Sequence, residues 1–213
     1  MPPRRARNFP LFPLDIVALP SEGVPLHIFE ERYRVMIGRC LEAQPGSPHR
    51  EFGIVWLSDE ELKPVGCACE VEEVIERMED GRMNILARGT RVFRLVNRQG
   101  DLPYPAGEVE FLAEIEEEPD EESAEAAHEL YRDLVRQATD RELEDAELLE
   151  LDAYGMAATV EFGVEAKQEL LELRSENARL KLLALLLEAA IDRLALLERA
   201  QARALSNGKV RFA

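Results

Sequence analysis

The stretch from Gly23 to Met36 holds the residue types that acid–base chemistry uses. Within it, His27 could exchange a proton near neutral pH, Glu30 could accept one, and Arg32 could stabilise a negative charge. The other two histidines lie far away in sequence, and neither has the spacing to His or Glu that is typical of zinc ligands. The stretch fits an active site or a structural junction, and an enzyme would need a deep pocket that holds clustered His27, Glu30 or Tyr33.

The rest of the chain offers no recognisable catalytic or metal-binding set. It has no phosphate-binding Gly-x-x-x-x-Gly-Lys-Ser/Thr loop and no Gly-x-Ser-x-Gly nucleophile motif. Cys67 and Cys69 have the spacing of half a metal site, but no second Cys or His pair completes it, so we interpret them as small core residues. The sequence therefore predicts a protein that is not an enzyme, with no catalytic residue, metal or cofactor.

The 213-residue chain is strongly acidic, with 43 Asp and Glu against 26 Lys and Arg and a net charge of -17. A surface of this sign repels phosphates and anionic lipids, which argues against nucleic acid as a partner. The longest apolar run, residues 182–187, is far shorter than the ~20 residues that span a bilayer. Because the cysteines are odd in number and no signal-peptide pattern is present, we expect a cytoplasmic protein with reduced thiols and no membrane partner.

One segment departs from this acidity. Between residues 82 and 100 there is no acidic residue, but there are five arginines: Arg82, Arg88, Arg91, Arg94 and Arg98. This arginine cluster could recognise an acidic peptide or RNA. Alternatively, its charge could be neutralised across neighbouring strands by Glu70, Glu72 and Glu73. We favour neutralisation, because hairpin pairing would supply the partners.

Six short apolar or β-rich runs predict strands in the first half, at residues 9–14, 24–29, 52–57, 65–78, 82–96 and 109–115. An Asp-Gly pair at residues 80–81 predicts a β-hairpin between the fourth and fifth of them. If these two are the turn residues, Glu73 faces Arg88 and Glu70 faces Arg91. Six short strands with one inserted helix are typical of a small closed or nearly closed barrel.

The inserted helix is predicted to begin inside the opening stretch. Apolar residues recur there with helical spacing, at Phe29, Tyr33, Met36, Ile37, Cys40 and Leu41. Glu30 and Glu31 are well placed near the positive N-terminal end of such a helix, and Pro45-Gly46 would end it. The charged residues of the stretch then lie at a strand-to-helix junction, which favours a structural role for most of them.

The second half has the periodicity of helices. Ten acidic residues and no basic ones lie between residues 108 and 125, and this change in composition predicts a boundary between domains at residues 1–116 and 117–213. Helical patterns follow at residues 127–138, 143–151 and 154–162, and a long last helix is expected from Ser175 to about Leu205. Its leucines could join two chains, but packing within one helical bundle is favoured, so we expect a monomer or a weak homodimer through this helix.

Several motifs together resemble the N-terminal substrate-binding domain of the Lon protease family. They are, in order, Phe12-Pro-Leu14, Pro25-Leu-His-Ile-Phe-Glu-Glu-Arg-Tyr33, Phe52-Gly-Ile-Val55 and Gly89-Thr-Arg-Val-Phe-Arg94. The resemblance implies an α+β fold: a PUA-like six-stranded pseudobarrel with an inserted helix, followed by an α-helical bundle that ends in a long helix. His27 stands where the family has a basic residue before the Ile.

The resemblance also implies a function. In full-length Lon this domain precedes ATPase and protease modules that this sequence lacks, so the chain resembles a free-standing domain. We expect a non-enzymatic module that binds protein or peptide clients, as an adaptor or regulator in protein quality control that could work with a separate ATPase or protease. The alternative is a PUA-like RNA-binding protein that uses the arginine cluster. The candidate binding residues are His27, Glu30, Arg32, Arg88, Arg91 and Arg94.

Overall fold

The computed structural model describes residues 5–44, 47–59 and 61–207. They form two compact units. Unit 1 contains the described residues up to Glu116 together with Tyr154–Ser175, and unit 2 contains Glu117–Ala153 together with the residues from Glu176 onward. The sequence expectation of 1–116 and 117–213 assigns residues 154–175 to the helical part, whereas in the structure they cluster with the strands.

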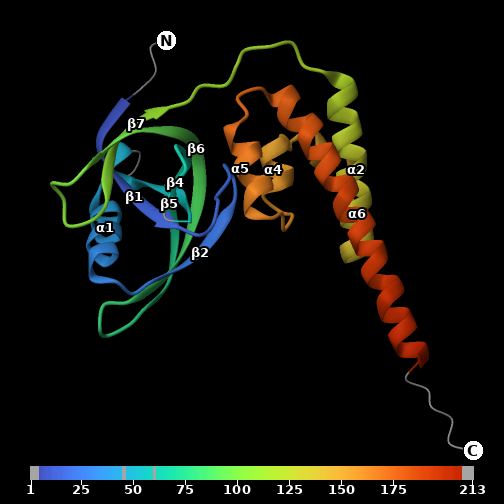
Figure 1. Cartoon of the computed structure of the whole chain (residues 1–213), viewed down its shortest axis with the longest axis horizontal. Helices are drawn as coiled ribbons and strands as arrows, with labels where there is room; N and C mark the ends of the chain where they lie inside the picture. Colours follow the sequence, from blue (N-terminus) through green and yellow to red (C-terminus); the bar gives the residue numbers. More distant parts are fainter. Residues whose placement is uncertain (1–4, 45–46, 60, 208–213) are drawn as a thin grey trace, which may run out of the picture. The chain divides into compact units, whose positions relative to one another are not determined.

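Unit 1 is built on a mainly antiparallel sheet (Figure 1). The described residues form seven strands: β1 (Arg5–Leu14), β2 (Gly23–Ile28), β3 (Glu51–Ser58), β4 (Glu61–Leu62), β5 (Val65–Arg77), β6 (Met83–Gln99) and β7 (Ala106–Phe111). The strand order is β1-β7-β6-β5-β3-β4, and β2 pairs with β6. Because β1 also pairs with β3 in parallel, the pairings β1–β7–β6–β5–β3–β1 form a closed circuit. The prediction of six strands was wrong by one, since the two residues of β4 are too few to show a pattern.

The β5–β6 hairpin was predicted correctly, but its register was not. The turn has three residues, 79–81, because the backbone N–H of Met78 donates to the carbonyl of Arg82 over 2.9 Å. Three further register shifts interrupt the ladder. As a result Arg88 faces Glu70 and Arg91 faces Ala68, not the predicted glutamates. Each β-bulge adds an unpaired residue to one strand, and the sequence pattern of these strands does not indicate where the bulges occur.

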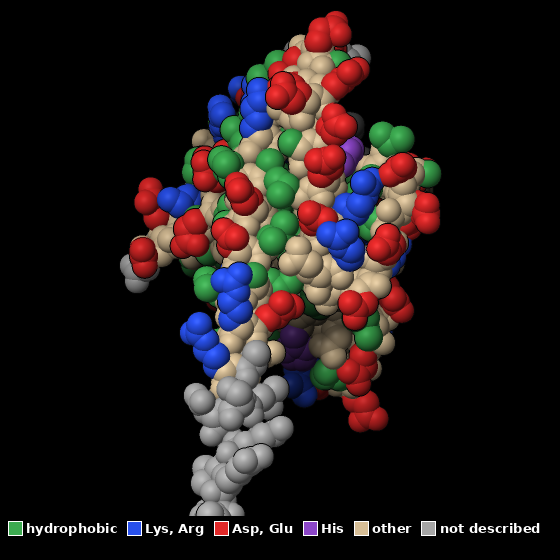
Figure 2. Space-filling view, turned by 90° about the vertical axis from the view of Figure 1, so that its right-hand side faces the viewer, with side chains coloured by type: hydrophobic (Ala, Val, Ile, Leu, Met, Phe, Trp, Pro, Cys, Tyr) green, Lys and Arg blue, Asp and Glu red, His purple; other side chains and the backbone are tan. Residues whose placement is uncertain are grey.

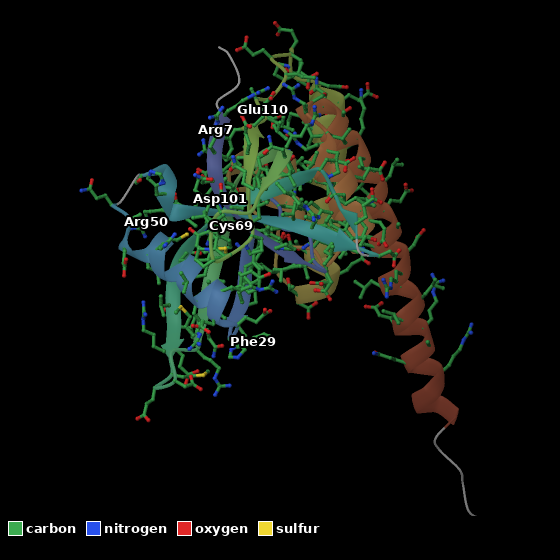
Figure 3. All side chains as sticks on the ribbon, turned by 60° about the vertical axis from the view of Figure 1, so that its left-hand side comes forward. Arg7, Phe29, Arg50, Cys69, Asp101 and Glu110 are labelled. Carbon is green, nitrogen blue, oxygen red and sulfur yellow. The ribbon has the colours of Figure 1, made fainter. Side chains whose placement is uncertain are left out.

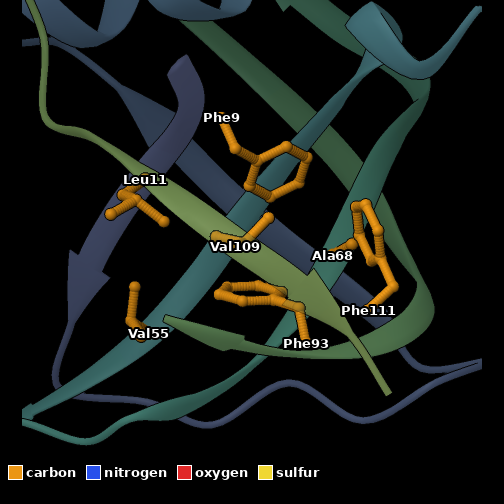
Figure 4. Packing of buried hydrophobic residues seen from close by; sticks show 7 residues of the cluster. All are labelled: Phe9, Leu11, Val55, Ala68, Phe93, Val109 and Phe111. Carbon is orange, nitrogen blue, oxygen red and sulfur yellow. The ribbon is translucent and has the colours of Figure 1, made fainter. Parts of the chain in front are cut away.

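A hydrophobic cluster of buried aromatic and aliphatic side chains from β1, β3, β5, β6 and β7 forms a core between the strands (Figure 4). The ring of Phe93 is fully buried and meets Phe9 edge-on, with ring centroids 5.4 Å apart. Gly53 leaves room for this ring, since a Cβ there would lie 2.5 Å from its Cζ. Burying one such side chain contributes about 1.5–3 kcal/mol, so this cluster holds the strands in place.

Helix α1 (Glu31–Glu42) covers the sheet with the predicted apolar stripe. Tyr33, Met36, Ile37 and Cys40 are all buried. Phe29 is the exception, because it precedes the helix and is 58% exposed at the periphery of unit 1 (Figure 3). The predicted apolar stripe began at Phe29, but the helix begins only at Glu31.

Two later helices, α4 (Ala153–Ala157) and α5 (Val164–Glu172), follow in the chain. Helix α5 contacts the strands of unit 1: Gln168 Nε2 donates to the carbonyl of Val65 over 3.2 Å, and Lys167 forms an ion pair with Glu22. Leu170 and Leu171 beside them are buried. These contacts explain why this segment belongs to unit 1.

Unit 2 contains α2 (Glu121–Thr139), α3 (Asp145–Leu149) and α6 (Glu176–Asn207). Helices α2 and α6 lie side by side (Figure 1), with Tyr131 and Leu134 of α2 and Leu183 and Leu187 of α6 buried. Acidic side chains clearly outnumber basic ones on the face seen in Figure 2. Of the described helices, none is long and apolar enough to cross a membrane.

Candidate functional site

His27 lies on the exposed surface of the sheet. Its Nδ1 is 2.6 Å from Asn84 Oδ1, and Asn84 Nδ2 donates to Glu76 Oε2 over 2.9 Å. Since the Asn84 amide nitrogen is the donor to Glu76, its oxygen accepts from Nδ1, which places a proton on that nitrogen of His27. The imidazole also stacks on the Phe29 ring, with centroids 5.7 Å apart. These contacts tie His27 to strand β6.

Glu30 and Arg32 pair with each other at the start of α1. Arg32 Nη2 lies 2.8 Å from Glu30 Oε2, and the guanidinium sits 4.6 Å from the centre of the Tyr33 ring. Tyr33 is buried against Phe12, and this burial raises the pKa of its hydroxyl. Tyr33 also lines the groove described below, whereas His27 and Glu30 do not, so His27, Glu30 and Tyr33 do not cluster in that pocket.

The arginine cluster is largely neutralised within unit 1. Arg88 makes a bidentate pair with Glu72, with contacts of 3.0 and 2.8 Å. Arg91 pairs with Glu51, a carboxylate that is only 5% exposed, and stacks on the Phe111 ring 3.6 Å away. The predicted partner Glu72 is confirmed, but Arg91 uses a residue forty positions away that the sequence did not suggest.

Arg94 and Arg98 differ from the other arginines of the cluster. Both are exposed, and within the described part of the chain neither forms an ion pair. Arg94 faces Glu110 in the β6–β7 ladder, but Glu110 pairs with Arg5 over 3.0 Å. Only these two members of the cluster therefore present a guanidinium without a carboxylate partner among the described residues.

Arg98 borders an apolar groove of about 610 Å³ in unit 1. The groove collects residues from α1 and from the ends of strands β1, β3, β4, β6 and β7. Most of its lining is apolar, and it consists of Leu11, Pro13, Arg32, Tyr33, Leu57, Leu62, Arg98, Gln99, Gly100, Pro105 and Ala106. Of the candidate binding residues from the sequence, Arg32 alone lines it. No sequence signal points to it, because its residues come from six separate elements.

The charged residues that line the groove differ from the acidic composition of the chain. The described residues of its lining include two arginines and no carboxylate. A second hollow of about 500 Å³ shares Leu62 and Arg98 with it and contains the carboxylates of Asp59 and Glu61. Arg98 therefore lies between a groove lined by arginines and a neighbouring hollow that is lined in part by carboxylates.

The described residues show no sign of a metal or a reactive thiol. No group of three or more His, Cys, Asp or Glu among them could hold a metal ion. The thiols of Cys40, Cys67 and Cys69 are free and buried, as predicted for core residues. Burial raises the pKa of Cys40 to about 12 and that of Cys67 well above its usual value, which disfavours the nucleophilic thiolate.

Residues 8–189 match the family model of the ATP-dependent protease La (LON) substrate-binding domain. The chain belongs to this family. A Lon N-terminal domain protein from Xanthomonas campestris has a similar crystal structure, with 25% sequence identity, a TM-score of 0.61, and coverage of 81% of this chain and 94% of the other. The N-terminal domain of Lon protease from the Mycobacterium avium complex shares the fold, with 20% identity, a TM-score of 0.59, and coverage of 84% and 96%.

The motifs that carry the resemblance to the Lon domain have structural uses here. Gly89 lies against the segment before β2: its N–H donates to the carbonyl of Glu22, and its own carbonyl accepts from Ser21 N–H. A Cβ on Gly89 would lie 2.0 Å from the carbonyl oxygen of Leu19. Only glycine fits at such a close approach, so Gly89 has a structural use in this motif.

Proposed function

We propose that the protein is a non-enzymatic binding module that captures an exposed apolar segment of a client protein in the groove of unit 1. The observation that carries this proposal is an open, mainly apolar groove in a domain whose family is described as substrate-binding. Binding sites for apolar side chains are concave and apolar with a few polar groups, as this groove is. One or two apolar side chains would bury enough surface for weak but measurable binding.

The test compares binding of a fluorescein-labelled ten-residue peptide by wild-type protein and by groove variants. The peptide is neutral, has blocked ends and carries Leu and Phe at its centre, and a Ser-Gly version serves as its control. Leu57 lines the groove and is 39% exposed, so Leu57→Asn should leave the fold intact. Loss of this contact should weaken binding by about 1–2 kcal/mol, or roughly 5- to 30-fold in Kd, measured by fluorescence anisotropy.

A matched control variant is Ile75→Asn. Ile75 lies on β5, is 57% exposed and does not line the groove, so the chemical change is similar at another place in unit 1. We expect wild-type affinity for this variant. Equal losses for both variants, or equal binding of the Leu-Phe and Ser-Gly peptides, would show that the groove is not the binding site.

We further propose that unit 1 is a PUA-like pseudobarrel and that the protein acts in the cytoplasm as an adaptor or regulator in protein quality control. The closed circuit of strand pairings supports the first proposal. The family relationship supports the second, in which a separate ATPase or protease degrades the captured client. Affinity purification from the native host should recover such a partner with wild-type protein and with the Ile75→Asn variant.

RNA binding through the arginine cluster has less support. Arg82, Arg88 and Arg91 all pair with carboxylates of the same unit, which leaves Arg94 and Arg98 to contact phosphates. Two phosphate contacts on a chain of net charge -17 would give only weak binding. Protein recognition is therefore the function that we put forward.

A further inference from the structure

The polar groups of the groove determine which apolar segments it should accept. Arg32 and Arg98 line it, and none of its described lining residues is a carboxylate. Glu30 compensates one of these two charges through its pair with Arg32, and within the described residues Arg98 has no ion-pair partner. The groove thus combines an apolar lining with one arginine, Arg98, that forms no ion pair with a described residue.

The two arginines are held differently, and this divides their roles. Arg32 is held in place by its hydrogen bond to Glu30 and by the ring of Tyr33, so its guanidinium serves mainly as a flat surface of the groove lining. Arg98 lies near the end of β6, where the groove meets the second hollow, and its guanidinium can turn toward a bound group. An anionic group that binds beside the apolar lining would meet Arg98.

We infer that the groove prefers client segments in which an acidic side chain stands directly beside a large apolar one. This inference rests on the proposed function. Leu62 and Arg98 line both the groove and the second hollow, so the two are neighbours and a segment bound in the groove can run on past Arg98. Asp59 and Glu61 repel an anionic group in the second hollow. The acidic side chain of the client should therefore bind within the groove, on the side of Arg98 that is nearer to Arg32.

The experiment uses three ten-residue peptides with blocked ends that differ at one position beside the central Leu: Asp, Asn or Lys. At low salt the Asp peptide should bind about three- to tenfold tighter than the isosteric Asn peptide, and the Lys peptide should bind more weakly than either. In 0.5 M NaCl the Asp–Asn difference should disappear, while the affinity of the Asn peptide changes little. The full chain is used throughout.

Arg98→Gln should bring the ratio of the Asp and Asn peptide affinities to about one, and this ratio is the readout, because Arg98 lines the groove and its replacement can change the affinity for both peptides. Arg94→Gln is the matched control, because Arg94 lies on the same strand, is equally free of ion pairs among the described residues, and does not line the groove. Unchanged Trp56 fluorescence confirms that both variants are folded. If Arg94→Gln removes the preference as effectively as Arg98→Gln, general charge attraction explains it and the inference is wrong.

The outcomes for the two proposals are separable. If the Asp and Asn peptides bind equally well and Leu57→Asn weakens both, the groove binds apolar segments without a charge preference, and only the inference fails. If no peptide binds, or if Leu57→Asn has no effect on any of them, the proposed function fails as well.

Discussion

Three arginines on strand β6 should differ sharply in what they contribute to stability, although the sequence presents them alike. We consider the replacement of Arg88, Arg91 and Arg94 by alanine, one at a time. Arg91 donates from Nε and Nη2 to the two carboxylate oxygens of Glu51, and Thr90 Oγ1 donates to the same carboxylate. Arg88 makes its pair with Glu72 at the surface, and Arg94 makes none within the described residues.

The magnitudes follow from burial. Removing one partner of a fully buried ion pair costs about 3–5 kcal/mol, because the other charge is left without compensation. The Glu51 side chain is 6% exposed but that of Arg91 is 32% exposed, so we expect about 2–3 kcal/mol for Arg91→Ala, which also loses the stacking on Phe111. For the half-exposed Arg88 we expect about 0.5–1 kcal/mol, and for Arg94 a change within about 0.5 kcal/mol.

The assay is equilibrium unfolding in urea, followed by the fluorescence of Trp56. This is the only tryptophan of the chain and lies on β3, the strand that begins with Glu51, so it reports on unit 1. Glu51→Gln combined with Arg91→Ala should cost less than the sum of the two single changes, because each has already broken the same pair. If Arg91→Ala is no more destabilising than Arg94→Ala, the buried pair does not stabilise unit 1 and Arg91 becomes a candidate for ligand binding again.

Two further predictions concern other parts of the chain. Gly89→Ala should destabilise unit 1 by about 1–3 kcal/mol in the same assay, because the added Cβ would overlap the carbonyl of Leu19. Gly38→Ala should instead stabilise helix α1 by about 0.5–1 kcal/mol, because no other described part of the chain lies within 4 Å of the added Cβ. Similar effects of the two substitutions would contradict the close approach at Gly89. In unit 2, the hydrogen bond from Lys181 lowers the pKa of Asp120 to about 2, below the value in the unfolded chain. This interaction therefore stabilises the folded state above about pH 4, and its contribution is lost as the pH falls from 4 to 2. The stability advantage of wild type over Asp120→Asn, measured by circular dichroism in urea, should shrink across that pH range; a constant difference would refute the assignment.

The sequence alone determined the local elements of this protein. The helical spacing of Tyr33, Met36, Ile37 and Cys40 predicted which face of α1 is buried, because side chains at these intervals share one face of a helix. The Asp-Gly pair predicted the β5–β6 hairpin, and the family motifs predicted the Lon substrate-binding domain that the comparisons show. All of these depend on residues that are close together in the chain.

Only the tertiary structure decided the rest. Bulges shifted the hairpin register, so Arg91 reached Glu51 on a different strand, and the exposed position of Phe29 depends on where the helix actually begins. The parallel pairing of β1 with β3 and the placement of residues 154–175 in unit 1 arise from contacts between distant segments. The groove is the clearest case: its residues span positions 11 to 106, and no local pattern records which strand ends meet in space.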